Sequence, residues 1–416
     1  MTKIDELIQE LCPDGVETFP LEECCNILDK KRKPVTKNSR EKGEYPYYGA
    51  NGVQDYVSDY IFNGKFVLVG EDGSVITKSG TPVVTWAEGK IWVNNHAHVI
   101  EEKSGTMLRY LYFYIQTIDV TSLIHGNIPK LTGRDFRSLK IALPPLEIQR
   151  EIVSILDNFT NLTAELTAEL TARKTQYGYY RDKLLEVETD IHKYTLGEIA
   201  TVTKLAGFEF TNYVTYSERG NIIALRGLNV KNGKLDLSDV KYIDKSDFSK
   251  LERSKLHIGD MLFTYVGTVG QVAIVDEEDK YYLAPNVALI RFDKKILLPQ
   301  YMKYYFQTTQ FWDKQIRRLL QSSSMQNIPM EKIRKFEIIV PPFDVQNRIV
   351  NVLDNFEKIC SDLNIGLPAE IEARQKQYEY YRDKLLTFAE TGNTILSRAE
   401  QSRAEQSRAE QSRAEH

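Results

Sequence analysis

The chain has 416 residues, a length that suits two or three domains rather than one core. It contains 42% hydrophobic and 27% charged residues, no apolar run of about eighteen residues, and a mixed N-terminus (MTKIDELIQELCPDG) without a secretory pattern, so we expect a soluble, cytoplasmic protein. The net charge of −4 excludes a uniformly basic nucleic-acid coat but allows local basic patches, and the 4 cysteines form no CxxC pair or disulfide framework.

Residues 17–143 are predicted to form a globular domain of short strands with Gly and Asn turns, as in TPVVTWAEGKIWVNN. Its segment KKRKPVTKNSREK (30–42) carries seven basic groups against one acid and leads into EYPYYGANG. A charge run is usually a solvated face, but cations also hold phosphates while neighbouring polar tips contact base edges. We expect phosphate contacts from Lys30, Lys31, Arg32, Lys33 and Lys37, and base contacts from Tyr47, Asn51, Asn94 and Asn95.

Residues 144–188 are predicted to form a long helix. Pro145 suits a first helical turn, and Glu147 favours a helix N-terminus. Apolar residues then recur from Ile148 onward at alternating spacings of four and three, which is typical of a coiled-coil seam. The tetrapeptide TAEL occurs twice in tandem within residues 163–172. One further copy would lengthen the helix by about 6 Å, about one turn, and keep the seam on the same face.

Residues 189–340 are predicted to form a second globular domain, with strands in NIIALRGLNVKNGKLDL and GDMLFTYVGTVGQVAIV. Residues 303–335 carry seven basic groups against two acids, around the polar loop QSSSMQN (321–327). By the same argument we expect phosphate contacts from Lys314, Arg317 and Arg318, and base contacts from Arg226, Thr268, Gln271, Ser323 and Gln326.

Residues 341–390 repeat the first helix. VPPFDVQNRIVNVLDNF (340–356) matches LPPLEIQREIVSILDNF (143–159), and QYEYYRDKLL (377–386) matches QYGYYRDKLL (176–185) at nine of ten positions. The offset grows from 197 to 201, so the second copy has four extra residues, and Gly366 and Pro368 predict a kink or restart there. A weaker echo pairs Asn-Ile-Pro at 127–129 with 327–329. The chain is therefore a duplication with the order globular–helix–globular–helix.

No convergent catalytic set is visible in the sequence. It lacks a GxxxxGK[ST] phosphate loop, and the residues before its Pro-Pro pairs, Leu143 and Val340, cannot accept the hydrogen bond that an amino-methyltransferase motif needs. His96 and His98 are candidate metal ligands on one strand face, but a polar strand face is the favoured interpretation because no further ligand is evident. We expect no enzyme activity, no metal and no cofactor in this chain.

Residues 391–416 end the chain in the repeat SRAEQ-SRAEQ-SRAEQ-SRAEH. The balanced charge and scarce apolar residues predict a disordered tail or a solvated helix. A repeated pentanucleotide GAGCA would encode this same repeat, and slippage in such a tract would shift the frame. We therefore also consider phase variation, in which the copy number decides the C-terminal end; mixed synonymous codons would remove this hypothesis.

The duplicated helical blocks and the opening LCPDGVETFPLEE (11–23) resemble the specificity (S) subunits of type I restriction-modification systems over about residues 1–388. The resemblance implies an α+β protein: two mixed α/β target-recognition domains separated by two long antiparallel coiled-coil helices, related by a pseudo-twofold repeat. It also implies that each domain binds half of a bipartite, asymmetric site on double-stranded DNA while the helices set the gap.

The same resemblance implies partners and cofactors. Two modification subunits would bind S-adenosylmethionine and dock on the helices, and restriction subunits would add ATP and Mg. The docking and spacer residues would be Leu156, Phe159, Tyr177, Tyr180, Arg181, Leu353, Phe356, Tyr378, Tyr381 and Arg382. The alternative is a non-catalytic coiled-coil scaffold whose paired globular domains bind protein or carbohydrate; salt-sensitive DNA binding separates the two.

Overall fold

Two compact units make up the chain. The computed structural model describes residues 3–73, 75–124, 128–186, 193–205, 212–320, 327–361 and 366–391. Unit 1 combines Met1–Leu166 with Ile371–His416, and unit 2 is Thr167–Glu370. Each unit therefore holds one globular segment, the start of one helical stretch and the end of the other. Within the described ranges, no helix is both long and apolar enough to cross a bilayer.

Unit 1 is built on a six-stranded sheet with the order β2-β7-β5-β6-β3-β4, in which only β3 and β6 pair in parallel. Side chains alternate across it: Val67 and Val69 join the cluster around the helices, while Phe66 and Leu68 join a second cluster on the other face. The strands are β1 (Thr18–Pro20), β2 (Asn26–Ile27), β3 (Lys42–Gly49), β4 (Gly52–Val57), β5 (Phe62–Gly70), β6 (Val84–Val93), β7 (Ala97–Glu101) and β8 (Lys140–Ala142), and the short helices are α1 (Lys3–Leu11), α2 (Leu21–Cys24), α3 (Leu108–Ile115) and α4 (Gly133–Arg137).

Unit 2 contains a four-stranded sheet, β10-β18-β15-β16, a three-stranded sheet, β14-β11-β17, and two strand pairs. Its strands are β9 (Lys193–Thr195), β10 (Ala200–Lys204), β11 (Ile223–Leu225), β12 (Val230–Lys231), β13 (Lys234–Leu235), β14 (Lys241–Tyr242), β15 (Met261–Thr264), β16 (Val272–Ile274), β17 (Tyr281–Leu283), β18 (Val287–Phe292) and β19 (Glu337–Ile339). Its short helices are α6 (Leu196–Ile199), α8 (Pro299–Phe306), α9 (Thr309–Phe311), α10 (Arg318–Leu320) and α11 (Met330–Arg334).

The two units share one plan. In each, the first strand pairs antiparallel with the strand that precedes a helical stretch, β1 with β8 and β9 with β19. In each, a central strand of the sheet also pairs antiparallel with a later strand, β5 with β7 and β15 with β18. The N–H of Leu131 donates to the carbonyl of Glu71, as the N–H of Ile328 does to Tyr265. This correspondence pairs Leu131 with Ile328, so the Asn-Ile-Pro echo predicted from the sequence is out of register by three residues.

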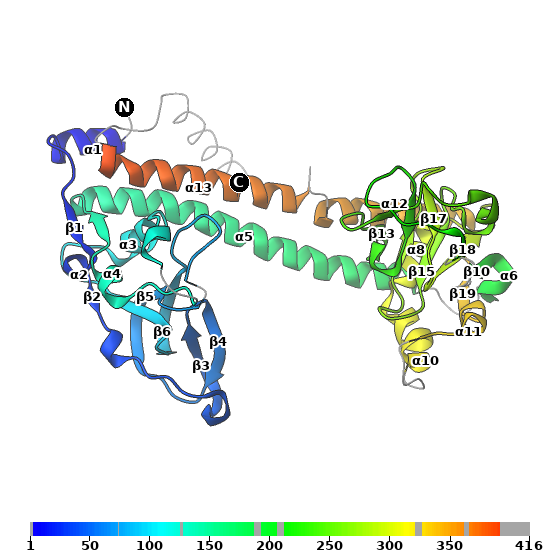
Figure 1. Ribbon diagram of the computed structural model, residues 1–416, viewed down its shortest axis with the longest axis horizontal. Helices are drawn as coiled ribbons and strands as arrows, with labels where there is room; N and C mark the ends of the chain where they lie inside the picture. The colour runs from blue at the N-terminus through cyan, green and yellow to red at the C-terminus, as the bar shows by residue number, and fades with distance from the viewer. Residues whose placement is uncertain are drawn as a thin grey trace. The chain divides into compact units, whose positions relative to one another are not determined.

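Helix α5 (Leu146–Leu185) runs without a break for 40 residues (Figure 1). The second copy instead forms α12 (Phe343–Ser361) and α13 (Leu367–Thr391), with a bend at Gly366. The predicted kink or restart is thus confirmed, because a new helix begins at Leu367 whereas α5 is unbroken. Pro368 is tolerated because it lies in the first turn of α13, where a backbone N–H has no partner within the helix. The SRAEQ repeats lie outside the described residues.

A buried glutamine joins each helix start to its own unit. The Gln149 side chain accepts from the N–H of Met107 (2.8 Å) and donates to the carbonyls of Pro144 (2.8 Å) and Gly105 (3.1 Å). The same three contacts recur at Gln346, with the N–H of Leu298 (3.0 Å) and the carbonyls of Pro341 and Ile296 (both 2.9 Å). Both glutamines are 0% exposed. The start of each helical stretch is therefore fixed to the helix that follows the sheet, α3 or α8.

The repeat also reappears in aromatic contacts between the helices. In unit 1, the ring of Phe159 stacks on Tyr381 with centroids 5.2 Å apart and an interplanar angle of 17°. In unit 2, the ring of Phe356 stacks on Tyr180 at 5.8 Å and 29°. Phe159 corresponds to Phe356, and Tyr180 to Tyr381, in the duplicated blocks. Within each unit, the start of one helical stretch thus packs on the end of the other.

Candidate nucleic-acid interface

The basic segment of unit 1 places its lysines outward. It folds into two short 3-10 turns, Asp29–Lys31 and Lys37–Ser39. The lysines expected to contact phosphates are all exposed: Lys30, Lys31, Lys33 and Lys37. The Lys33 ammonium lies 6.0 Å from the centroid of the Trp92 ring, whose Nε1 donates to the Lys33 carbonyl (2.6 Å). The segment is therefore held against the end of β6 while it presents cations to solvent.

Arg32 differs from its neighbours because its side chain points inward. Its Nη1 contacts the Glu71 carboxylate at 2.6 Å and the Ala97 carbonyl at 2.8 Å, and its Nη2 lies 3.5 Å from the Asp29 carboxylate. The side chain is only 12% exposed. We therefore correct the expectation of a phosphate contact: Arg32 is a positioning residue, because it ties the basic segment to the turn before β7.

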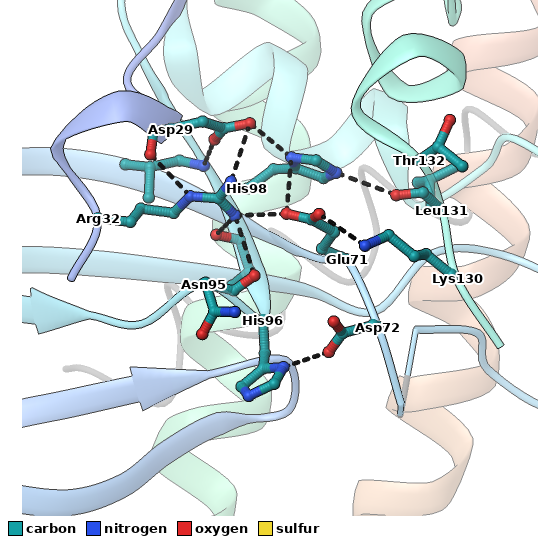
Figure 2. A network of polar contacts seen from close by, with 12 residues as sticks. Asp29, Arg32, Glu71, Asp72, Asn95, His96, His98, Lys130, Leu131 and Thr132 are labelled. Carbon is teal, nitrogen blue, oxygen red and sulfur yellow. Dashed lines mark hydrogen bonds and ion pairs between the residues drawn. The ribbon is translucent and has the colours of Figure 1, made fainter. Parts of the chain in front are cut away.

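The buried histidine His98 lies at the centre of this network (Figure 2). Its Nε2 donates to the carbonyl of Leu131 (3.1 Å), which can only accept, and its Nδ1 lies 2.7 Å from the Asp29 carboxylate. Both ring nitrogens thus face hydrogen-bond acceptors. The ring is 0% exposed and stacks on Phe136 at 4.1 Å.

Charge balance stabilises this burial. Burial alone would raise the pKa of Asp29, but hydrogen bonds from His98 and from the N–H of Val99, together with the charge of Arg32, hold that pKa below its usual range. Glu71 also pairs with Lys130 at 3.3 Å. Asp29, Glu71 and His98 offer ligand atoms within 4.8 Å of one another. Because hydrogen bonds and ion pairs to other residues already occupy these groups, we do not assign a metal site to them.

The remaining polar residues of this region divide into buried and exposed ones. His96 lies in the turn between β6 and β7 and pairs with Asp72. This pair is separate from the contacts that His98 makes (Figure 2). Tyr47 is 1% exposed with its hydroxyl on Val35, and Asn94 is 3% exposed and accepts from the N–H of His96 (2.8 Å). We correct the expectation for both, since neither presents a tip to a ligand. The candidates that remain exposed are Asn51 and Asn95.

Unit 2 carries its predicted cations on a π-helical turn, Trp312–Arg317, and on α10. Lys314, Arg317 and Arg318 are exposed, and Arg317 pairs with Asp313 one turn away (2.9 Å). This turn packs on the loop between β15 and β16: a Cβ added to Gly270 would lie 2.3 Å from the Trp312 ring. Ser323 and Gln326 lie outside the described residues.

A hollow of about 470 Å³ opens beside that loop, lined by Tyr216, Arg226, Gly227, Leu228, Thr264, Val266, Thr268, Ala284, Pro285 and Asn286. Two of the predicted base-contacting residues, Arg226 and Thr268, line it. Thr268 is exposed, whereas the guanidinium of Arg226 is held by Asp239 (3.0 Å). Gln271 does not line the hollow, and its side chain accepts from the N–H of Asn232 (3.0 Å). The Arg226 and Gln271 side chains thus serve the fold, which weakens the expectation that they contact bases.

The predicted docking residues hold the helices to their own units. Leu156 and Leu353 are 0% exposed, and Tyr381 is 6% exposed, so these three have no surface to offer a partner. Phe159, Phe356 and Tyr180 make the stacks described above, and the guanidiniums of Arg181 and Arg382 lie 5.8 and 5.7 Å from the rings of Tyr177 and Tyr378. The exposed aromatic side chains of this surface include Tyr179, Tyr180 and Tyr380.

Sequence reasoning missed the buried network and the glutamine joints. The glutamines were visible, since both LEIQR and FDVQN carry one at the same place in the repeat. The pairing of Asp29, Glu71 and His98 had no local signal, because these residues come from three separate segments of the chain.

Comparison with known proteins identifies the family. The model of the type I restriction modification DNA specificity domain matches residues 13–173 and again 188–373. A Haemophilus influenzae protein named as a type I restriction enzyme specificity subunit is 36% identical over 90% of this chain and 96% of its own length. The EcoR124I/EcoR124II specificity subunit of Escherichia coli is 34% identical over 69% of this chain and 72% of its own length.

Solved structures show the same fold. A type I S subunit from M. genitalium superposes with a TM-score of 0.53 and 13% identity, covering 90% of this chain and 97% of its own. A chain solved in work on complex assembly and conformational transition of the type I system gives a TM-score of 0.57 and 14% identity over 90% of this chain and 98% of its own. The chain thus belongs to the type I restriction-modification DNA specificity family and is a specificity subunit.

Proposed function

We propose that each unit binds one half of a bipartite, asymmetric DNA site and that the helices set the gap between the halves. The observation that supports this proposal is that the two units share one fold but differ in their surface residues. Both units keep the glutamine joint and the aromatic stack, whereas their exposed loops differ. Two domains of one plan with different surfaces suit two different half-sites. Membership of the family leaves the protein- or carbohydrate-binding scaffold without support.

The helices suit a spacer. At 40 residues, α5 is about 60 Å long, and the tandem TAEL repeat lies within it. The division between the units falls at Leu166 and Thr167, inside that repeat. We propose that α5 pairs antiparallel with α12 and α13, and that the exposed tyrosines Tyr179 and Tyr380 belong to the surface on which modification subunits dock.

The exposed cations are the proposed phosphate contacts: Lys30, Lys31, Lys33 and Lys37 in unit 1, and Lys314, Arg317 and Arg318 in unit 2. Such contacts determine the position and affinity of the protein on DNA rather than its sequence specificity. Asn51 and Asn95 remain the proposed base contacts of unit 1. The side chains of Tyr47, Asn94 and Arg32, which are largely buried, would hold the exposed DNA-contacting residues of unit 1 in position.

Catalysis would belong to the partners. We propose that this cytoplasmic chain binds no cofactor, that two modification subunits bring S-adenosylmethionine, and that restriction subunits bring ATP and Mg. Phase variation through the SRAEQ tail remains a hypothesis about the gene.

Two assays test this function. Binding of the modification complex to DNA should weaken steeply with salt, because phosphate contacts release counterions, and a salt-independent affinity would point to a scaffold. Adenine methylation should require the modification subunits; methylation by this chain alone would contradict the non-catalytic role.

A further inference from the structure

The hollow of unit 2 lies at a definite place in the shared fold. In unit 1 the register pairs Gly70 with Ala97, the first residue of β7. In unit 2 the register pairs Thr264 with Val287, the first residue of β18. The turn before β7, residues 94–96, therefore corresponds to residues 284–286, which line the hollow. The cross-connections after these strands correspond as well, with bridges from Asp72 to Lys130 and from Val266 to Asn327.

The two units differ in the residues around these equivalent turns. In unit 1, Glu71 after β5 and His98 on β7 belong to the buried network, in which Arg32 and Asp29 link them (Figure 2). The same positions in unit 2 are Tyr265 and Ala288, which are uncharged, belong to a buried apolar cluster and do not line the hollow. The hollow of about 470 Å³ instead lies beside Thr264 and Val266, whose side chains alternate with that of Tyr265 along the chain.

The lining of the hollow combines polar tips with an apolar wall. Thr268 and Asn286 are exposed at it, and Val266, Ala284 and Pro285 form part of the wall. Asparagine amides suit the adenine edge, and threonine methyl or apolar groups suit the thymine methyl. The buried Nε of Arg226, also at this wall, has no hydrogen-bond acceptor among the described residues. An oxygen or nitrogen of a bound group would give it one.

Two features keep the rim in place beside the cations. The Thr264 hydroxyl donates to the carbonyl of Thr268 and accepts from the N–H of Gln271 (3.0 Å), which fixes the loop. The same loop packs through Gly270 on Trp312, the first residue of the basic π-helical turn. The exposed cations of this turn and the polar rim of the hollow are thus joined by one loop.

We propose that the hollow of unit 2 receives base edges of one DNA half-site, with Asn286 and Thr268 as specificity-determining residues. This inference rests on the proposed function. It assigns base recognition in unit 2 to the turn before β18, and in unit 1 to the corresponding turn at Asn95 and His96.

The test uses Asn286→Gly in the complete modification complex. Asn286 has φ +71°, a left-handed conformation that glycine adopts without strain, so the variant removes the amide and leaves the backbone in place. Asn232→Gly is the matched control, because Asn232 is an exposed asparagine with φ +48° that does not line the hollow. Thr268→Val removes a rim hydroxyl at nearly constant size.

Genome-wide adenine-methylation mapping gives the result. Asn286→Gly should relax at least one base position of one half-site by about tenfold or more, with the other half-site and the gap unchanged. Thr268→Val should act on the same half-site, and Asn232→Gly should leave both unchanged. An unchanged methylation motif in both Asn286→Gly and Thr268→Val would overturn the inference. An equal loss of base specificity in the Asn232→Gly control would overturn it as well. If the wild-type complex yields no split motif, the proposed function itself fails.

Discussion

Replacing Gln346 with alanine should destabilise unit 2 strongly. The side chain is 0% exposed and serves three backbone groups: it accepts from the N–H of Leu298 (3.0 Å) and donates to the carbonyls of Ile296 and Pro341 (both 2.9 Å). Each buried group left without a partner costs about 1–3 kcal/mol, and partial rescue by water reduces the total. We expect unit 2 to lose about 3–5 kcal/mol of stability. Its local opening should then be about 100-fold or more frequent.

Hydrogen exchange of the full-length chain measures this locally, which matters because a protein with two units does not unfold in one step. Amides of α8 should exchange about 100-fold faster in the variant, while those of α3 in unit 1 stay unchanged. The control is Asn347→Ala on the same helix. Within the described residues its exposed side chain bonds only the Phe343 carbonyl, so its loss should cost less than about 0.5 kcal/mol. Gln346→Glu keeps the size of the side chain but directs an oxygen at two carbonyls, so it should also destabilise. Protection of α8 equal to that of the control would refute the reasoning.

Three further predictions follow from the helices and the buried charges. Inserting one TAEL after Leu170 should lengthen the methylated motif's gap, by at most about two base pairs, and leave both half-sites unchanged; an unchanged gap would contradict the spacer role. Burial would raise the pKa of Glu357, but its contacts with Lys303 (2.8 Å) and Tyr304 (2.9 Å) lower that pKa. Ionised Glu357 therefore stabilises unit 2 at pH values above its ordinary pKa of 4.5, and this stabilisation is lost as pH falls through the lowered pKa. Glu357→Gln should therefore reduce the acid sensitivity of unit 2 in denaturation at about pH 6 and about pH 3, and equal pH dependence would exclude this residue as a cause. Arg32→Ala should lower the melting temperature of unit 1, whereas Lys31→Ala should chiefly reduce the salt dependence of DNA binding; the reverse pattern would contradict their assigned roles.

The helical organisation could be predicted from the sequence because its signals are local. The four-three spacing from Ile148 and the proline at position 145 indicated a helix that the structure has as α5. Gly366 and Pro368 indicated the interruption of the second copy, since proline cannot continue a helix beyond its first turn. Family membership followed from the duplicated blocks, whose letters survive in both copies.

The site could be predicted only in part. The exposure of Lys30, Lys31 and Lys33 agrees with a solvated basic segment, but the inward turn of Arg32 depends on Glu71, which lies 39 residues away in sequence. Composition cannot show which member of a basic run meets a distant carboxylate. Asn286 gave no signal either, because its place at the hollow depends on the register of β15 and β18.

The most direct measurement is genome-wide adenine-methylation mapping in cells that carry or lack this chain together with its modification subunit. The account predicts one split, asymmetric motif that appears only when this chain is present, with two half-sites and a fixed gap. The absence of a new motif in cells that hold a stable complex of the two proteins would contradict the central claim. Repeating the experiment without residues 397–416 would show whether the tail, rather than DNA recognition, is responsible for that silence.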